Sequence, residues 1–367
     1  MSQIYLEHAA TNRAAHIWRY TAWEKAHPTG KVNDFPSSTP PIISISQVDG
    51  NPAPSGVSIG KASASDLERL GHDLDFDDGT AAPTFIAALA DSISILKIED
   101  KTTLESPLLI TIETTGDICS IRLLIDIGSQ VQGEIITVIE GNANWTGILR
   151  EGRYGQNSIV NDVVTQITGQ RLLRCDSLTL ERDAQIKAGT VNASSSQAKI
   201  DIRHWLPEPG SSLKVNGSIL SSEDNKVDSH IEISHTGKET HSRLEWHSAC
   251  GGKSNTTGTG MLRIDAGAKG ADAGQLFHNL LLSERATANS IPELEVLENE
   301  VVGCGHGTAN GPIDEQQLFY LYTRGFDEEQ ARSALIAAFL NAPLSDMGSQ
   351  ELHGYLIQRI ENHLKTI

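Results

Sequence analysis

Cys304 and His306 are the residues of this sequence whose types and spacing point most directly to chemistry. They lie two positions apart, and residues i and i+2 of a β-strand face the same side. A thiolate and an imidazole together suit binding of iron or zinc, and also sulfur transfer. Two ligands do not complete a metal site, so the others would come from solvent or a partner. The structural alternative is a small buried cysteine beside a hydrogen-bonded histidine in a glycine-rich turn.

Two other groups of residues carry weaker signals. His230, His235 and His241 lie close together in the sequence, but as metal ligands they would have to converge from different strands. Polar positions on solvent-facing or interface strands explain them as well. The segment Gly252–Ser254 resembles the end of a phosphate-binding loop, but that motif needs a glycine where this sequence has His247. We therefore predict no ATP site in this chain.

Composition excludes several classes of protein. The 367 residues carry a formal net charge of −18, which disfavours a general nucleic-acid binder and docking on anionic lipid. No apolar run approaches the length of a membrane span, and the N-terminal segment lacks the apolar stretch of a signal peptide. The four cysteines form no Cys-x-x-Cys pair, and Cys119 and Cys250 are expected in the core. These observations predict a cytoplasmic protein without nucleic-acid or membrane partners.

The elements that must position these residues change along the chain. Residues 1–92 are expected to be helical and irregular, with helices near 13–26, 63–71 and 81–92. Residues 93–310 consist of short segments with period-two alternation, of which Ser229–Ser234 is typical. A sandwich, a barrel and a parallel β-helix all fit this pattern. Its length and a weak echo between 177–184 and 280–286 favour the β-helix.

Residues 311–367 have a helical period instead. Asp314 with Gln317 indicates the start of a helix over 315–323, in which Leu318 and Phe319 are expected to pack in the core. Asp327 with Gln330 starts a second helix that runs to about Asn341, and Ser349 caps a third. We predict a C-terminal helical domain with one apolar face left for a partner.

A set of short segments in fixed order resembles the SufB/SufD family of iron–sulfur cluster assembly proteins, and within it the SufD branch. Asn279 and the Cys-Gly-His run at 304–306 are SufD-like, where SufB has a cysteine and a Glu-His-Glu run. Gly303 and Gly305 depart from the lysine and serine that are usual in SufD. The segments that carry the resemblance are Trp18–Thr21, Asn279–Ser283, Pro292–Glu295, Cys304–Gly307, Ile313–Leu321 and Arg324–Gly325.

The resemblance implies a right-handed parallel β-helix flanked by an N-terminal helical region and a C-terminal helical domain. It implies a scaffold subunit, not an enzyme, which pairs with SufB through the β-helix and binds the ATPase SufC through the C-terminal helices. Cys304 and His306 would then lie at the SufB interface as candidate metal ligands. No permanently bound cofactor is expected, only transient iron or a nascent iron–sulfur cluster. The candidates for SufC docking are Phe319, Tyr320, Tyr322 and Arg324.

Two alternatives stay open at this point. The chain could form a homodimer, in isolation or as a SufB/SufD-like scaffold that works with SufC alone. It could also be a β-helix enzyme acting on polysaccharide, which would need paired acids flanking a groove, although no such cluster stands out in the sequence.

Overall fold

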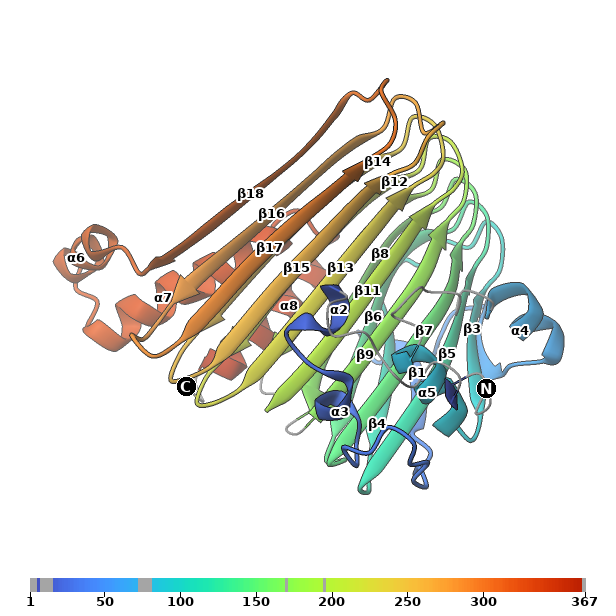
Figure 1. Ribbon diagram of the computed structural model, residues 1–367, viewed down its shortest axis with the longest axis horizontal. Helices are drawn as coiled ribbons and strands as arrows, with labels where there is room; N and C mark the ends of the chain where they lie inside the picture. Colours follow the sequence, from blue (N-terminus) through green and yellow to red (C-terminus); the bar gives the residue numbers. More distant parts are fainter. Residues whose placement is uncertain (1–4, 7–15, 72–80, 169–170, 194–195, 365–367) are drawn as a thin grey trace.

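The computed structural model describes residues 5–6, 16–71, 81–168, 171–193 and 196–364. Within them the chain forms a parallel β-helix of two nine-stranded sheets that face each other (Figure 1). Successive strands from β4 onward alternate between the sheets, so each coil contributes one strand to each. Residues that pair within a sheet occupy equivalent positions of successive coils. Trp145 pairs with Arg171 in this way, and Asn255 pairs with Thr287. The predicted β-helix with helices at both ends is confirmed.

The two sheets are named here I and II. Sheet I runs in the order β1 (Ile42–Gln47), β4 (Leu108–Thr114), β6 (Gln132–Gly141), β8 (Ile159–Thr168), β10 (Gln185–Ala193), β12 (Ser212–Ser221), β14 (His241–Cys250), β16 (Asp272–Leu281) and β18 (Gly303–Pro312). Sheet II runs in the order β2 (Val57–Lys61), β3 (Ile93–Ile98), β5 (Ile118–Ile127), β7 (Trp145–Tyr154), β9 (Arg171–Leu180), β11 (Gln197–Leu206), β13 (Lys226–His235), β15 (Asn255–Ile264) and β17 (Thr287–Val296).

The two ends of the β-helix differ. At the N-terminal end, β1 and β2 pair antiparallel with β4 and β3 and cover the edges of the first coil. The sequence predicted only an extended, turn-rich segment there. At the other end, β17 and β18 are the last strands of their sheets in the described part of the chain. The molecule therefore has one covered end and one open end.

The turns that lead from sheet II to sheet I stack on one another and hold the register. In successive coils Gln130, Asn157, Asp183, Gly210, Glu239 and Gly270 have left-handed backbone conformations. Each donates its backbone N–H to a carbonyl in the corresponding turn of the next coil, over 2.7–3.2 Å. Glycine fits this conformation without strain. At Gly210 a Cβ would also lie 2.0 Å from the Asp183 carboxylate, so a larger residue here would have to displace the Asp183 side chain.

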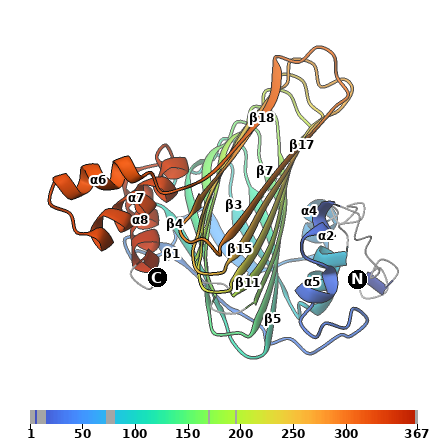
Figure 2. The ribbon, with the colours of Figure 1, turned by 60° about the vertical axis from the view of Figure 1, so that its left-hand side comes forward.

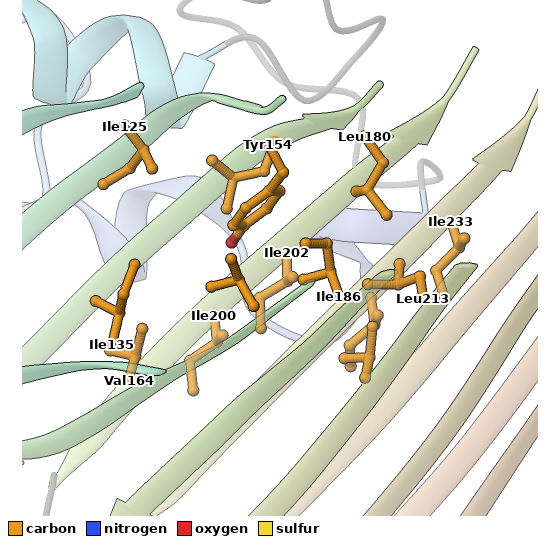
Figure 3. Packing of buried hydrophobic residues seen from close by; sticks show 14 of the residues in the cluster. Ile125, Ile135, Tyr154, Val164, Leu180, Ile186, Ile200, Ile202, Leu213 and Ile233 are labelled. Carbon is orange, nitrogen blue, oxygen red and sulfur yellow. The ribbon is translucent and has the colours of Figure 1, made fainter. Parts of the chain in front are cut away.

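The interior between the sheets is mostly aliphatic (Figure 3). Alternate residues of each strand point into it, among them Ile200, Ile202 and Leu213. A charged group also lies within this core: Arg150 donates to Asp162 and Asp176 at 2.6 and 2.9 Å, and Tyr154 donates to Asp162 at 2.6 Å. Buried charges of this kind are tolerated when each is paired.

Helices cover the outer face of each sheet, on opposite sides of the β-helix (Figure 2). On sheet II, Trp145 packs beneath Trp23 and Phe85 and donates its indole N–H to the Ala26 carbonyl at 2.8 Å. On sheet I, Leu340 and Leu356 pack over Val163 and its neighbours. The helices are α2 (His16–Arg19), α3 (Trp23–Ala26), α4 (Ala64–Leu70), α5 (Ala81–Leu89), α6 (Glu315–Thr323), α7 (Glu328–Asn341), the 3₁₀ turn η1 (Ala342–Leu344) and α8 (Gln350–Leu364).

The predicted helices near 63–71 and 81–92 and the three C-terminal helices are confirmed, although part of the 13–26 prediction lies outside the described residues. Strands β3, β8, β10 and β18 were not predicted. Of these, β8 and β10 carry polar side chains such as Asp162 and Thr190 on their buried face, and β18 is rich in glycine, which hides the alternation that a strand normally shows. None of the helices in the described ranges combines the length and the apolarity needed to cross a bilayer.

Candidate functional site

Cys304 and His306 lie on β18, at the open end of the β-helix. Ala273 of β16 pairs with Cys304, and Gln275 pairs with His306. Ala273 and Cys304 both contact the interior core, so this face of β18 points toward the space between the sheets. Cys304 is half-buried and His306 is exposed. The strand thus places a thiol and an imidazole on one face of the last coil.

Burial raises the pKa of the Cys304 thiol, and the nearby Asp272 carboxylate adds to this effect. The group is therefore a thiol at neutral pH, and it becomes a thiolate ligand when a metal ion displaces its proton. Cys119, Cys175 and Cys250 are buried, as expected for Cys119 and Cys250, and burial raises the pKa of each. Cys304 is the most accessible of the four cysteines.

A cavity of about 630 Å³ lies at this end of the molecule. It is lined by β12, β14, β16 and β18 and by the segment that follows α7, and both Cys304 and His306 contribute to its lining. Four of its charged side chains form two pairs, since Arg243 contacts Asp272 at 2.6 Å and Lys214 contacts Asp346, and the Glu245 carboxylate also lines it. The cavity has room for a small ion or ligand.

The last coil is much more exposed than the coils before it. Every residue of β17 and β18 is half-buried or exposed, whereas β9 and β11 are buried at all but two positions each. The outer edges of β17 and β18 have no partner strand within the described residues. A strand edge of this kind can pair with another chain.

The predicted docking residues Phe319, Tyr320, Tyr322 and Arg324 lie on α6 or at its C-terminal end, and all are exposed. The expectation that Phe319 packs in the core is wrong, because its side chain is 68 % exposed. Helix α6 buries none of its residues, and it lies away from the sheets in both views (Figures 1 and 2). Leu318 alone of the expected core pair packs partly against the helical cluster.

The three clustered histidines do not converge. His230 contacts Thr259 at 2.9 Å, His235 contacts Thr240 and Ser242 at 2.8 Å each, and His241 lies 3.9 Å from Asp272. These contacts give the histidines structural roles at three separate places.

Sequence reasoning missed a different group, Glu245, His247 and His278, whose ligand atoms lie within 4.8 Å of one another. Glu245 and His247 share one face of β14, and His278 pairs with His247 from β16. One signal of this group was present in the sequence. Glu245 and His247 are two residues apart, and a further histidine, His278, stands at the position of the next coil that pairs with His247.

Comparison with known proteins agrees with this architecture. A family model described as SUF system FeS cluster assembly, SufBD core domain, matches residues 110–339. An iron–sulfur cluster assembly SufBD family protein of Mycobacterium tuberculosis is 24 % identical over 95 % of this chain and 88 % of its own length. A related protein of Mycobacterium leprae is 29 % identical, and the match spans half of this chain and 49 % of that protein.

Proteins named SufD also resemble parts of the chain. Iron–sulfur cluster assembly protein SufD of Bacillus subtilis is 30 % identical over 36 % of this chain and 30 % of its own length. That of Escherichia coli is 25 % identical over 42 % of this chain and 36 % of its own length. The family model covers well over half of the chain and includes most of the β-helix. The chain therefore belongs to the SufBD family of SUF-system iron–sulfur cluster assembly proteins.

Proposed function

We propose that this chain is a SufD-like scaffold subunit that pairs with a SufB chain through its last coil. The observation that carries this proposal is the open end of the β-helix, where β17 and β18 leave both sheet edges exposed. Main-chain hydrogen bonds along such an edge can extend each sheet into a partner. The resemblance to proteins named SufD supports the choice of SufD over SufB.

In this proposal iron and sulfide are the cargo, and Cys304 and His306 present two of the groups that meet them. The remaining ligands come from SufB or from solvent, because a thiol and an imidazole from one strand leave a cluster incompletely coordinated. All four cysteines are free, which fits a reducing compartment, and we place the assembly in the cytoplasm.

Helix α6 is the proposed docking surface for the ATPase SufC. Phe319, Tyr320, Tyr322 and Phe326 expose large aromatic side chains on or just after this helix. The Arg324 guanidinium stacks over the Tyr320 ring at 5.1 Å. Exposed aromatic and arginine side chains are the residues that dominate protein–protein binding energies. ATP-driven closure of SufC would act on the scaffold only through contacts that differ between the open and closed states.

The pairing with SufB is tested by mixing the full chain with SufB from the same source. Light scattering should give the mass of a one-to-one heterodimer. Hydrogen exchange at the amides of β17 and β18 should slow on mixing, because their outer edges become hydrogen-bonded, while β9 and β11 should not change. A stable homodimer that ignores SufB, or slowed exchange confined to other strands, would contradict the proposal.

The docking of SufC is tested by the double substitution Phe319→Ala with Tyr320→Ala in the full chain. We expect SufC binding, measured by calorimetry, to weaken by about 30-fold or more, since truncating a central aromatic anchor typically costs at least about 2 kcal/mol. The fold should be unaffected, because α6 buries no residue.

Tyr20→Ala provides the matched control for this experiment. It removes an exposed aromatic side chain that follows α2, on the other side of the β-helix, and should leave SufC binding intact. Equal losses in the Tyr20 variant and the double variant, or no loss in either, would exclude α6 as the docking surface.

A further inference from the structure

Glu245, His247 and His278 form a compact group on the outer face of sheet I, beneath the C-terminal helices. The Nε2 atom of His247 lies 3.1 Å from Oε1 of Glu245 and 3.1 Å from Nδ1 of His278. Two ligands bound to one tetrahedral ion at about 2.0–2.1 Å lie about 3.3 Å apart. The two distances from His247 therefore match the spacing of a metal site, and all three ligand atoms lie within 4.8 Å of one another.

The His247 ring is held in the orientation that a metal ligand needs. Its Nδ1 atom lies 2.7 Å from the backbone carbonyl oxygen of Phe339, and its ring stacks on the Phe339 ring at 4.6 Å. A carbonyl only accepts hydrogen bonds, so Nδ1 carries the proton and Nε2 presents its lone pair to Glu245 and His278. Metal-binding histidines are typically oriented by this kind of second hydrogen bond.

The Nε2 atom of His247 lies between two groups that can bind a cation. The His247 side chain is only 5 % exposed. With the Nδ1 proton donated to Phe339, Nε2 can accept one hydrogen bond from His278, but it offers no proton to the Glu245 carboxylate 3.1 Å away. A metal ion between these atoms would give the carboxylate the positive partner that His247 does not provide.

We propose that Glu245, His247 and His278 bind a divalent first-row transition metal ion such as Fe²⁺ or Zn²⁺. Two imidazoles and one carboxylate are a donor set that suits both ions and leaves coordination positions open. The Glu245 side chain is 40 % exposed, so water can occupy those positions. Glu245 also lines the cavity to which β18 contributes Cys304 and His306.

This site is distinct from the Cys304–His306 pair and does not depend on the proposed role of the chain. His247 and His278 lie on the outer face of sheet I, whereas Cys304 faces the interior of the β-helix. Metal binding can be measured on the full chain alone, so its failure and the failure of SufB pairing are separate results.

The experiment is a titration of the chelator-treated full chain with Co²⁺, followed by visible absorption and by competition with Zn²⁺. We expect one ion per chain with absorption bands of a nitrogen- and oxygen-ligated site and no thiolate charge-transfer band. His278→Gln and Glu245→Gln should each weaken binding by about 100-fold or more, since even losing a residue that only orients a ligand costs about 10–100-fold. Both side chains are partly exposed, so these variants should fold.

His241→Gln and His306→Gln are the matched controls. His241 lies on β14 with Glu245 and is exposed, and His306 lies at the candidate assembly site. Both variants should bind Co²⁺ like the unmodified chain. The proposal is overturned if the chain binds no Co²⁺, if His278→Gln and Glu245→Gln bind it normally, or if binding shows a thiolate band and is lost in His306→Gln.

Discussion

Replacing Arg150 by alanine is expected to lower the free energy of unfolding by about 3–5 kcal/mol, because it leaves buried carboxylates without their counter-charge. The guanidinium is 2 % exposed and contacts Asp162 at 2.6 Å and Asp176 at 2.9 Å. Asp176 keeps Arg174 as a second partner. Asp162 keeps the Tyr154 hydroxyl as its remaining side-chain partner within the described residues. Urea unfolding followed by circular dichroism measures the change.

Arg153→Ala is the control for this prediction. Arg153 lies on β7 with Arg150 and also contacts two carboxylates, those of Asp126 and Glu181, but its side chain is 35 % exposed. Exposed ion pairs contribute about 0–1 kcal/mol, so the expected loss is far smaller.

A second variant, Arg150→Met combined with Asp162→Asn, removes both charges and should recover much of the stability lost by Arg150→Ala. Equal losses for Arg150→Ala and Arg153→Ala would show that the buried pair contributes no more than a surface pair.

The second large effect is a loss of stability as the pH falls from about 6.5 to about 4. Burial lowers the pKa of His204 and of His235 from 6.5 to about 4 in each case. Asp176 and Asp162 oppose this shift at His204, and Asp272 opposes it at His235, but desolvation outweighs them. Both histidines are therefore neutral in the folded protein near pH 7.

Whether stability rises or falls with pH depends on whether the folded or the unfolded state binds the proton. Below about pH 6.5 the unfolded chain takes up protons at these histidines while the folded protein does not, so stability falls with pH. The stabilising contribution of these two neutral histidines is fully present above about pH 6.5. A shift of one pKa unit corresponds to about 1.36 kcal/mol, so each histidine contributes about 3 kcal/mol to the loss at pH 4.

Unfolding in urea between pH 7.5 and pH 4 measures this slope. His235→Gln can keep a hydrogen bond to Thr240 or Ser242 but does not titrate, so its stability should fall less steeply as the solution is acidified. His306→Gln removes an exposed histidine that does not contribute to the pKa shift of His235, and it should keep the original slope. An unchanged slope in the His235 variant would contradict the assignment to this residue.

Local sequence determined the elements whose cause is itself local. Period-two alternation over Ser229–Ser234 predicted part of β13, because one side of that strand must be buried. The start of α7 followed from Asp327 and Gln330, whose side chains form the expected capping box. Gly325 has the left-handed conformation expected of a glycine after a helix. The spacing of Cys304 and His306 predicted that they would share a face if their segment formed a strand, but the glycine-rich run of β18 has no alternation that predicts the strand itself.

Only the tertiary structure decided what depends on distant parts of the chain. Asp162 lies on a buried strand because Arg150, on the other sheet, neutralises it, and no local pattern records that pairing. Phe319 has the polarity of a core residue, yet it is exposed because α6 lies away from the sheets. His278 meets His247 because the intervening turns bring the two residues into register on neighbouring strands.

The length of a coil is not constant along the β-helix. The segment that separates the paired residues Asn255 and Thr287 is longer than the one that separates Trp145 and Arg171. A fixed repeat in the sequence therefore cannot predict which residues of successive coils lie side by side. The register, and with it the group of Glu245, His247 and His278, is set by the stacking of the turns and strands in three dimensions. Each coil pairs with its neighbour through backbone hydrogen bonds, which every residue type except proline can donate, so these bonds leave no mark in the sequence.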